Sequence, residues 1–303
     1  MKIIVIGAGA MGSIYGGHLS LCNDVTLIDT NSALVEKINH NGLMLEENGE
    51  KNIYRPKAKV EVSASDKADL IILFTKSLYS KSALDGVRSA IGPDTYLMTL
   101  QNGAGHERLL GEYVDKDHII IGTTEDNGAV ISLACVHHGG KGITNIGLLS
   151  GVHGKVLDEI KDSFDKSGFD VRIHSNIQHL IWDKLMTNAS LSVLTAILQC
   201  DMGYIAANEN ARGLCLKLIG ETVAVANAMG LGFDLDEVEK KVISTSENNK
   251  DGYTSIMIDI KNSRRTEVDT ISGAVVVKAK ELGINVPYME MAVSLVHALE
   301  DRR

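Results

Sequence analysis

Short runs of apolar and β-branched residues alternate with helical patterns along the first half of the chain, which predicts parallel strands joined by helices. The runs that predict strands are Ile3–Ile6, Val25–Ile28, Leu70–Phe74, Tyr96–Leu100 and His118–Ile121. We expect three further stretches to extend this sheet, with at least one antiparallel pair: Ala129–Val136, Gly142–Ile146 and Val171–His174.

The pattern changes after about residue 175, where strand-like alternation disappears. Apolar residues then recur at helical spacing in Ile181–Cys200, Gly213–Met229 and Thr270–Leu282. The chain of 303 residues is also longer than a typical single domain. We therefore predict an α/β domain at residues 1–174 and an all-α domain at residues 175–303.

Charge and hydropathy exclude several classes of partner. The chain carries 30 basic and 39 acidic side chains, a formal charge of −9, which repels nucleic acid and anionic membranes. No segment approaches the roughly 20 apolar residues of a membrane span, and the first residues lack the features of a signal peptide. We expect no nucleic acid partner, no membrane attachment and a cytoplasmic location.

The sequence spacing of cysteines and histidines gives no sign of a metal site. The four cysteines are far apart and form no C-x-x-C pair. His137, His138 and His179 do not have the spacing of metal ligands. We therefore predict reduced thiols, histidines that are solvated or hydrogen-bonded, and no metal.

A glycine-rich motif follows the first predicted strand and opens a segment of helical periodicity. It has the form G-x-G-x-x-G and consists of Gly7, Ala8, Gly9, Ala10, Met11 and Gly12. Such glycines allow a tight turn, a close approach of backbone to pyrophosphate, and packing of the helix on the strand. Because the motif alone is common, its structural context decides whether it indicates a dinucleotide-binding site.

Asp29 provides that context. It ends the second predicted strand, twenty residues after Gly9, where dinucleotide-binding folds carry an acid that binds the adenosine ribose. The sequence therefore predicts a Rossmann-like dinucleotide-binding domain. Because a carboxylate repels the 2′-phosphate of NADP, we expect NAD(H) as the preferred cofactor, with NADP(H) as the alternative.

Two polar groups directly follow predicted strands. Lys76 comes after the third strand and Asn102 after the fourth, at the sheet edge where ligands of open α/β sheets bind. Lys76 is positioned to bind a phosphate or ribose oxygen, and Asn102 to bridge the nicotinamide ribose and a substrate. Taken alone, Lys76 is most simply a solvated lysine and Asn102 a turn-forming asparagine.

The helical half contains two groups of polar residues. Lys184, Asn188 and Ser192 recur every four residues and share one side of about 12 Å of helix, facing either water or a site. The second group is Ser255 with Glu267, which alone is most simply an exposed acid. Reduction of a ketone needs a hydride and a proton donor, and a partly buried lysine held by a carboxylate suits the second role.

Together these motifs, in this order, resemble those of ketopantoate reductases, also called 2-dehydropantoate 2-reductases, over nearly the whole chain. The resemblance implies a Rossmann-like domain, a helical domain and an active site in the cleft between them. It assigns Lys184 as the catalytic acid, Glu267 as the carboxylate that positions the lysine and the substrate hydroxyl, and Asn102 as the bridge between cofactor and substrate. It further implies that Asn188 and Ser255 bind the polar groups of a 2-oxo acid.

Two positions depart from the family pattern. Asp29 stands where NADP-dependent members carry a basic residue, and Ser192 stands where ketopantoate-specific members tend to carry asparagine. The family is also similar to NAD-dependent D-2-hydroxyacid dehydrogenases that act on branched or aromatic 2-oxo acids. Ser192 therefore remains a candidate contact that tunes the choice of substrate.

We predict reduction of a 2-oxo acid to a D-2-hydroxy acid, with ketopantoate to pantoate, a step of pantothenate biosynthesis, ranked first. The NAD-dependent D-2-hydroxyacid dehydrogenase is the alternative. A nicotinamide-binding redox sensor without catalysis is the alternative from another class, but a sensor has no need of Lys184, Asn188 and Glu267 together. The expected partner is a small-molecule 2-oxo acid, and the assembly is compatible with a homodimer.

Overall fold

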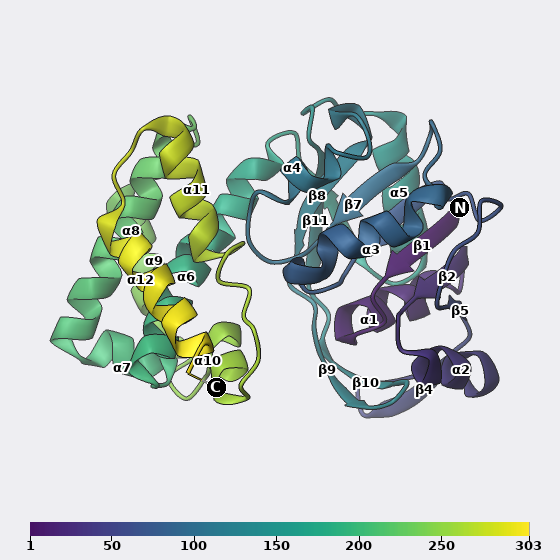
Figure 1. The fold of residues 1–303 in the computed structure, drawn as a ribbon, viewed down its shortest axis with the longest axis horizontal. Coiled ribbons are helices and arrows are strands. Elements are labelled where there is room, and N and C mark those ends of the chain that lie inside the picture. Colours follow the sequence, from purple (N-terminus) through teal and green to yellow (C-terminus); the bar gives the residue numbers. More distant parts are fainter. Residues whose placement is uncertain (303) are drawn as a thin grey trace. The chain divides into compact units, whose positions relative to one another are not determined.

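The computed structural model describes residues 1–302, which divide into two compact units, each visible in Figure 1. The α/β unit contains residues Met1–Gln101 and His106–Ile177. The helical unit contains the chain from Gln178 onward together with the short segment Asn102–Gly105. None of the helices within residues 1–302 is long and apolar enough to cross a bilayer.

An eight-stranded sheet forms the centre of the α/β unit, with strand order β12-β11-β8-β7-β6-β1-β2-β5. Its strands are β1 (Lys2–Ile6), β2 (Asp24–Ile28), β5 (Lys57–Lys59), β6 (Leu70–Leu73), β7 (Tyr96–Thr99), β8 (Ile119–Thr124), β11 (Ile143–Leu148) and β12 (Asp170–Ile173). The six strands from β5 to β8 are mutually parallel, whereas β11 is antiparallel to β8. Strand β6 is buried along its whole length, as expected for a parallel strand covered on both faces.

The chain order of the parallel strands reverses between β1 and β6. From β1 the chain proceeds to β2 and β5 on one side, and from β6 to β7 and β8 on the other. In open α/β sheets this switch point is where ligands bind, beyond the carboxyl ends of the strands. The predicted Rossmann-like fold is confirmed, and the motif after β1 lies at its switch point.

Five α-helices belong to the α/β unit: α1 (Ala10–Leu19), α2 (Ser32–Asn41), α3 (Ser80–Val87), α4 (His106–Leu110) and α5 (Lys155–Lys166). Single 3₁₀ turns occur at Ser77–Tyr79, Arg88–Ala90 and Lys116–His118. Helix α1 is buried from Gly12 to Leu19, and its Tyr15 ring stacks on Phe169 with centroids 4.3 Å apart. The helix after the glycine motif is therefore a central element of the core.

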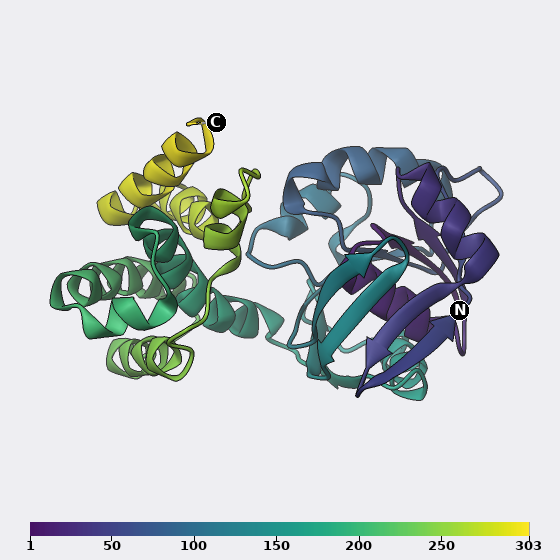
Figure 2. The same cartoon turned by 90° about the horizontal axis from the view of Figure 1, so that it is seen from below.

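A second sheet lies against α1, with strand order β4-β3-β10-β9. Its strands are β3 (Leu43–Glu47), β4 (Glu50–Tyr54), β9 (Asn127–Ser132) and β10 (Cys135–Gly140). Figure 2 shows the teal β9–β10 hairpin and the purple-blue β3–β4 hairpin of this sheet. The second sheet explains why α1 is enclosed.

The predicted strand Ala129–Val136 is wrong in two respects. The backbone turns at Ala134, whose φ of +56° is left-handed, and this turn divides the stretch into β9 and β10. Both strands then join the second sheet, because β10 pairs in parallel with β3 and not with the main sheet. The other two stretches do extend the main sheet, as β11 and β12, and the predicted antiparallel pair is β11 with β8.

The helical unit confirms the prediction of an all-α second part. Its helices are α6 (Ile177–Leu198), α7 (Met202–Ala207), α8 (Glu209–Ala228), α9 (Leu235–Asn248), α10 (Ser255–Lys261), α11 (Ser272–Leu282) and α12 (Pro287–Glu300). Side chains of Asp201, Asn208, Asp234 and Thr254 accept backbone N–H groups at four helix starts. Pro287 opens α12 at the position where its missing N–H costs no helical hydrogen bond.

Candidate active site

The glycine turn joins β1 to α1 in a conformation that its glycines make possible. Gly7 has a φ of +94°, and its N–H donates to the carbonyl oxygen of Ile28 at 2.8 Å. A Cβ at Gly12 would lie 1.8 Å from the carbonyl oxygen of Gly7, so the helix packs against the turn at a distance that excludes a side chain. A Cβ at Gly9 would meet no atom within 4 Å. The turn thus has no room for a side chain at Gly12, whereas the space next to Gly9 contains no protein atoms.

Asp29 is fixed beside this turn by two backbone donors. Its Oδ2 accepts the N–H of Ala8 at 2.9 Å, and its Oδ1 accepts the N–H of Asn31 at 2.9 Å. The side chain is half-buried. A carboxylate oxygen accepts more than one hydrogen bond, so both oxygens keep acceptor capacity for ribose hydroxyls.

The ends of β1, β6 and β7 are joined around Thr75. A Cβ at Gly7 would lie 3.0 Å from the Thr75 nitrogen, and Gln101 Nε2 donates to the Thr75 carbonyl oxygen at 2.6 Å. Thr75 Oγ1 is buried and has no hydrogen-bond partner within residues 1–302. Lys76, the next residue, is half-buried. A buried hydroxyl without a partner requires explanation, and a ligand at the switch point supplies one.

These observations fit a bound dinucleotide. The open position is at Gly9, the second glycine of the motif, which in dinucleotide-binding folds lets the backbone approach the pyrophosphate. The Asp29 carboxylate follows β2, and the buried hydroxyl of Thr75 borders the turn. Unpaired N–H groups at the start of α1 favour an anion there. The fit rests on these side chains and backbone groups together and not on the motif alone.

The remaining predicted site residues all belong to the helical unit: Asn102, Lys184, Asn188, Ser192, Ser255 and Glu267. On α6, Lys184 and Asn188 are half-buried, whereas Ser192 is only 4% exposed. Ser255 is exposed at the first position of α10. Their roles toward a substrate stay predictions.

Glu267 is in a segment that Glu300 of α12 holds in place. The buried carboxylate of Glu300 accepts the backbone N–H of Thr266 at 2.6 Å, Arg265 Nη1 at 2.9 Å and His297 Nδ1 at 3.1 Å. Burial alone would raise the pKa of Glu300, but the hydrogen bonds from Thr266 and Arg265 lower it to about 2. The segment that carries Glu267 is therefore anchored by a buried, ionised carboxylate.

Two hydroxyl contacts bring further parts of the helical unit together. Ser272 Oγ at the start of α11 donates to the Ala189 carbonyl oxygen of α6 at 2.8 Å. Thr195 Oγ1 of α6 lies 2.7 Å from Thr254 Oγ1, immediately before Ser255. These bonds connect the helix of Asn188 to the segments that contain Glu267 and Ser255.

The Asn102 segment contacts the chain next to Glu267. The N–H of Ala104 donates to the Thr270 carbonyl oxygen at 2.9 Å. A Cβ at Gly103, whose φ is +99°, would lie 2.0 Å from that same oxygen. The helical unit thus groups the segments of Asn102 and Glu267.

Sequence reasoning missed Glu300 and the buried hydroxyl of Thr75. The signal for Glu300 was present, because the buried residues of α12 are Met289, Ala292, Val296 and Glu300, which places an acid on the apolar face. An acid at such a position must be paired or hydrogen-bonded. For Thr75, no sequence pattern distinguishes a hydroxyl that lacks a partner.

The chain is similar to known proteins over almost its whole length. Residues 3–151 match the family described as "Ketopantoate reductase PanE/ApbA", and residues 176–300 match its C-terminal family. Proteins named 2-dehydropantoate 2-reductase are 32% identical in Streptococcus pyogenes and 34% identical in Pyrococcus horikoshii, with 99% of this chain and 98% of each relative covered.

A solved structure of D-mandelate dehydrogenase with NADH and anilino(oxo)acetate is 32% identical, with a TM-score of 0.89, and the match covers 99% of this chain and 98% of that one. Both parts of the chain thus match one family, and the fold is shared with a solved D-mandelate dehydrogenase. The chain belongs to the ketopantoate reductase family of oxidoreductases acting on CH–OH groups.

Proposed function

We propose that this protein reduces 2-dehydropantoate (ketopantoate) to pantoate, as in pantothenate biosynthesis. The observation that carries the proposal is the identity of 32–34% to 2-dehydropantoate 2-reductases over 98% of their length. The Lys184, Asn188, Ser255 and Glu267 positions that the family uses are also all present. The product is a 2-hydroxy acid of D configuration.

The proposed cofactor is NAD(H), with NADP(H) as the less favoured alternative. Asp29 supports NAD(H), because its carboxylate is held beside the glycine turn, where we expect the adenosine ribose, and would repel a 2′-phosphate. The D-mandelate dehydrogenase relative was solved with NADH. When bound, the reduced nicotinamide supplies the hydride that this reaction needs.

The residues of this protein have four tasks in the proposed mechanism: binding the cofactor, orienting the nicotinamide ribose, binding the substrate and transferring a proton. The N–H groups at the start of α1 bind the pyrophosphate, and Asp29 accepts the ribose hydroxyls. Lys76 binds a phosphate or ribose oxygen, and Asn102 orients the nicotinamide ribose relative to the substrate. Asn188 and Ser255 bind the polar groups of the 2-oxo acid.

Lys184 and Glu267 carry out the fourth task, proton transfer. Lys184 gives a proton from Nζ to the carbonyl oxygen as C2 accepts the hydride, and its positive charge stabilises the developing alkoxide. Glu267 orients Lys184 and the new hydroxyl. Glu300 serves this step indirectly, because it anchors the segment that carries Glu267.

A second candidate function is that of a D-2-hydroxyacid dehydrogenase for branched or aromatic 2-oxo acids. The D-mandelate dehydrogenase relative supports it, as does Ser192 in place of a family asparagine. Ser192 is shorter and almost fully buried, so it gives a substrate less to contact than asparagine would.

The test is a panel of 2-oxo acids that includes ketopantoate and phenylglyoxylate, each assayed with NADH and with NADPH. We expect the highest kcat/KM with ketopantoate and NADH. A higher kcat/KM with phenylglyoxylate would favour the second candidate. Absence of cofactor oxidation with every acid would refute both.

A further inference from the structure

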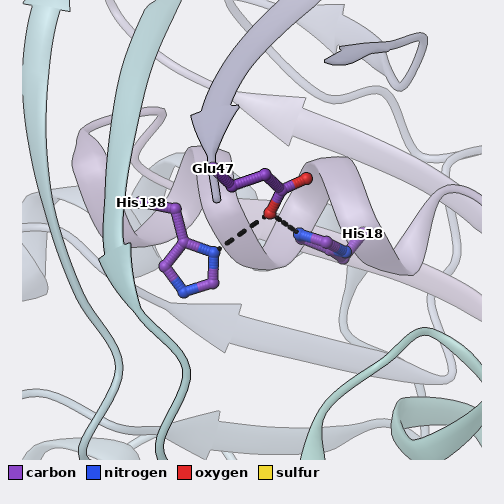
Figure 3. A group of neighbouring side chains, drawn as sticks. All are labelled: His18, Glu47 and His138. Carbon is purple, nitrogen blue, oxygen red and sulfur yellow. Dashed lines mark hydrogen bonds and ion pairs between the residues drawn. The ribbon is translucent and has the colours of Figure 1, made fainter. Parts of the chain in front are cut away.

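Three buried side chains from three separate elements converge beside the second sheet (Figure 3). His18 of α1 places its Nε2 2.9 Å from Glu47 Oε2 of β3, and His138 of β10 places its Nδ1 3.2 Å from the same oxygen. All three potential ligand atoms lie within 4.8 Å of one another. The three side chains are between 2% and 8% exposed. None of them belongs to the proposed active site.

A second layer of partners orients this cluster. His138 Nε2 lies 3.0 Å from Asp126 Oδ1, and the other oxygen of Glu47, Oε1, accepts the Tyr54 hydroxyl at 2.6 Å. Metal-bound imidazoles typically direct their second nitrogen to a carboxylate, and metal-bound carboxylates are themselves hydrogen-bonded. The cluster has both features.

The buried carboxylates of Glu47 and Asp126 require a compensating positive charge. Glu47 is buried and contacts both imidazoles through one carboxylate oxygen. Asp126 adds a second carboxylate. With both imidazoles neutral the group carries two negative charges, so either a proton on His138 or a divalent ion must compensate them.

The distances within the cluster fit a shared ion. Charge-assisted hydrogen bonds between nitrogen and carboxylate oxygen typically measure about 2.7–2.9 Å. The His18 contact with Glu47, at 2.9 Å, lies within this range, whereas the two His138 contacts are longer, at 3.2 Å to Glu47 and 3.0 Å to Asp126. Two ligands of one tetrahedral zinc ion, each bound at about 2.0–2.1 Å, lie about 3.3 Å apart. The separation between His138 and Glu47 is close to that value.

We propose that His18 Nε2, His138 Nδ1 and Glu47 Oε2 bind one zinc-class divalent ion. Two imidazoles and one carboxylate suit Zn²⁺, whereas Mg²⁺ and Ca²⁺ prefer oxygen ligands only. Binding displaces the proton from His138 Nδ1, and the proton that His18 Nε2 donates to Glu47 in the ion-free protein moves to His18 Nδ1. Affinity for the ion therefore rises with pH.

The ion is structural, because its three ligands are buried and none of them belongs to the proposed active site. It connects α1 to β3 and β10, and so fastens the second sheet to the helix that begins at the glycine turn. Glu47 is 29 residues from His18 and 91 residues from His138 in sequence, so no short spacing motif could predict this site.

Zinc binding to the full-length protein tests this proposal. Wild-type protein is stripped with a chelator, dialysed and titrated with Zn²⁺ or Mg²⁺, and metal content and Tm are measured. We expect one Zn²⁺ per chain and a rise in Tm of about 5–10 °C at a hundredfold excess over Kd, with no effect of Mg²⁺. Co²⁺ in place of Zn²⁺ should give the visible absorption bands of a tetrahedral site.

The chain offers a matched control on the same strand. His138→Gln should lose the stoichiometric ion and the rise in Tm, whereas His137→Gln, at the exposed neighbouring position, should retain both. If stripped wild-type protein takes up no zinc and its Tm is unchanged, the cluster is held by a proton and the proposal is wrong. Equal zinc uptake by wild type and His138→Gln would also contradict it, because the ion would then bind elsewhere.

Discussion

Alanine substitutions at two glycines of the turn should separate folding from cofactor binding. A Cβ at Gly12 would lie 1.8 Å from the Gly7 carbonyl oxygen, and Cβ contacts under 3.0 Å essentially never occur, so the helix and turn must move apart by at least 1.2 Å. Overpacking of a rigid contact costs about 1–3 kcal/mol. Gly12→Ala should therefore lower Tm by about 3–10 °C.

Gly9→Ala should behave differently, because its Cβ would meet no protein atom within 4 Å. The φ of −70° at Gly9 also suits alanine, so the free energy of unfolding should change by less than about 1 kcal/mol. The added methyl group instead occupies the space proposed for the pyrophosphate. We expect the Kd for NADH to rise at least tenfold, a change of about 1.4 kcal/mol.

Thermal unfolding and titration of NADH fluorescence measure these two effects on the same preparations. The expected pattern is a lower Tm for Gly12→Ala, and a wild-type Tm with weakened NADH binding for Gly9→Ala. Wild-type NADH affinity in Gly9→Ala would refute the assignment of this turn to the cofactor. Wild-type stability in Gly12→Ala would refute the packing argument.

Three further substitutions test other parts of the site. Lys184→Met should lower kcat/KM by at least about 100-fold and leave the Kd for NADH unchanged; a smaller loss would mean that another group supplies the proton. Asp29→Asn should reduce the preference for NADH over NADPH about tenfold in steady-state kinetics, and an unchanged ratio would remove Asp29 from cofactor selection. Glu300→Gln should lower the free energy of unfolding at pH 7 by roughly 3 kcal/mol in urea titrations, since the folded-state pKa is about 2 against an ordinary 4.5. A lowered carboxyl pKa stabilises the fold above the ordinary pKa, and this stabilisation is lost as the pH falls through the folded value. The difference in the free energy of unfolding between Glu300→Gln and wild type should therefore shrink between pH 4.5 and 2. A constant difference would contradict the role of Glu300 as an ionised anchor.

The parts of the fold that follow local rules were predictable from the sequence. Strand β6 is an uninterrupted apolar run, as a strand buried on both faces must be, and the glycine turn has a fixed spacing to Asp29. The second sheet was not predictable in this way. The burial pattern of β4 is almost entirely exposed, so this strand carries no alternation to detect, and β9 has the same character.

The contacts that complete the candidate site depend on tertiary structure. Glu300 meets Thr266 across 34 residues, and Ser272 meets Ala189 across 83. Sequence alone identifies which residue types are present and which spacing they have, but such pairs exist only once the helices are packed. The order of the family motifs implies that Lys184 and Glu267 act together, and this pairing stays a prediction.

The central claim is that Lys184 and a dinucleotide on the glycine turn together reduce a 2-oxo acid. The most direct measurement is the oxidation of NADH by purified protein with ketopantoate, followed by chiral analysis of the product, for wild type and Lys184→Met. The proposal predicts D-pantoate in stoichiometric yield from wild type and at least a 100-fold slower rate from the variant. No ketopantoate-dependent NADH oxidation by wild type, or equal rates for the two proteins, would contradict it.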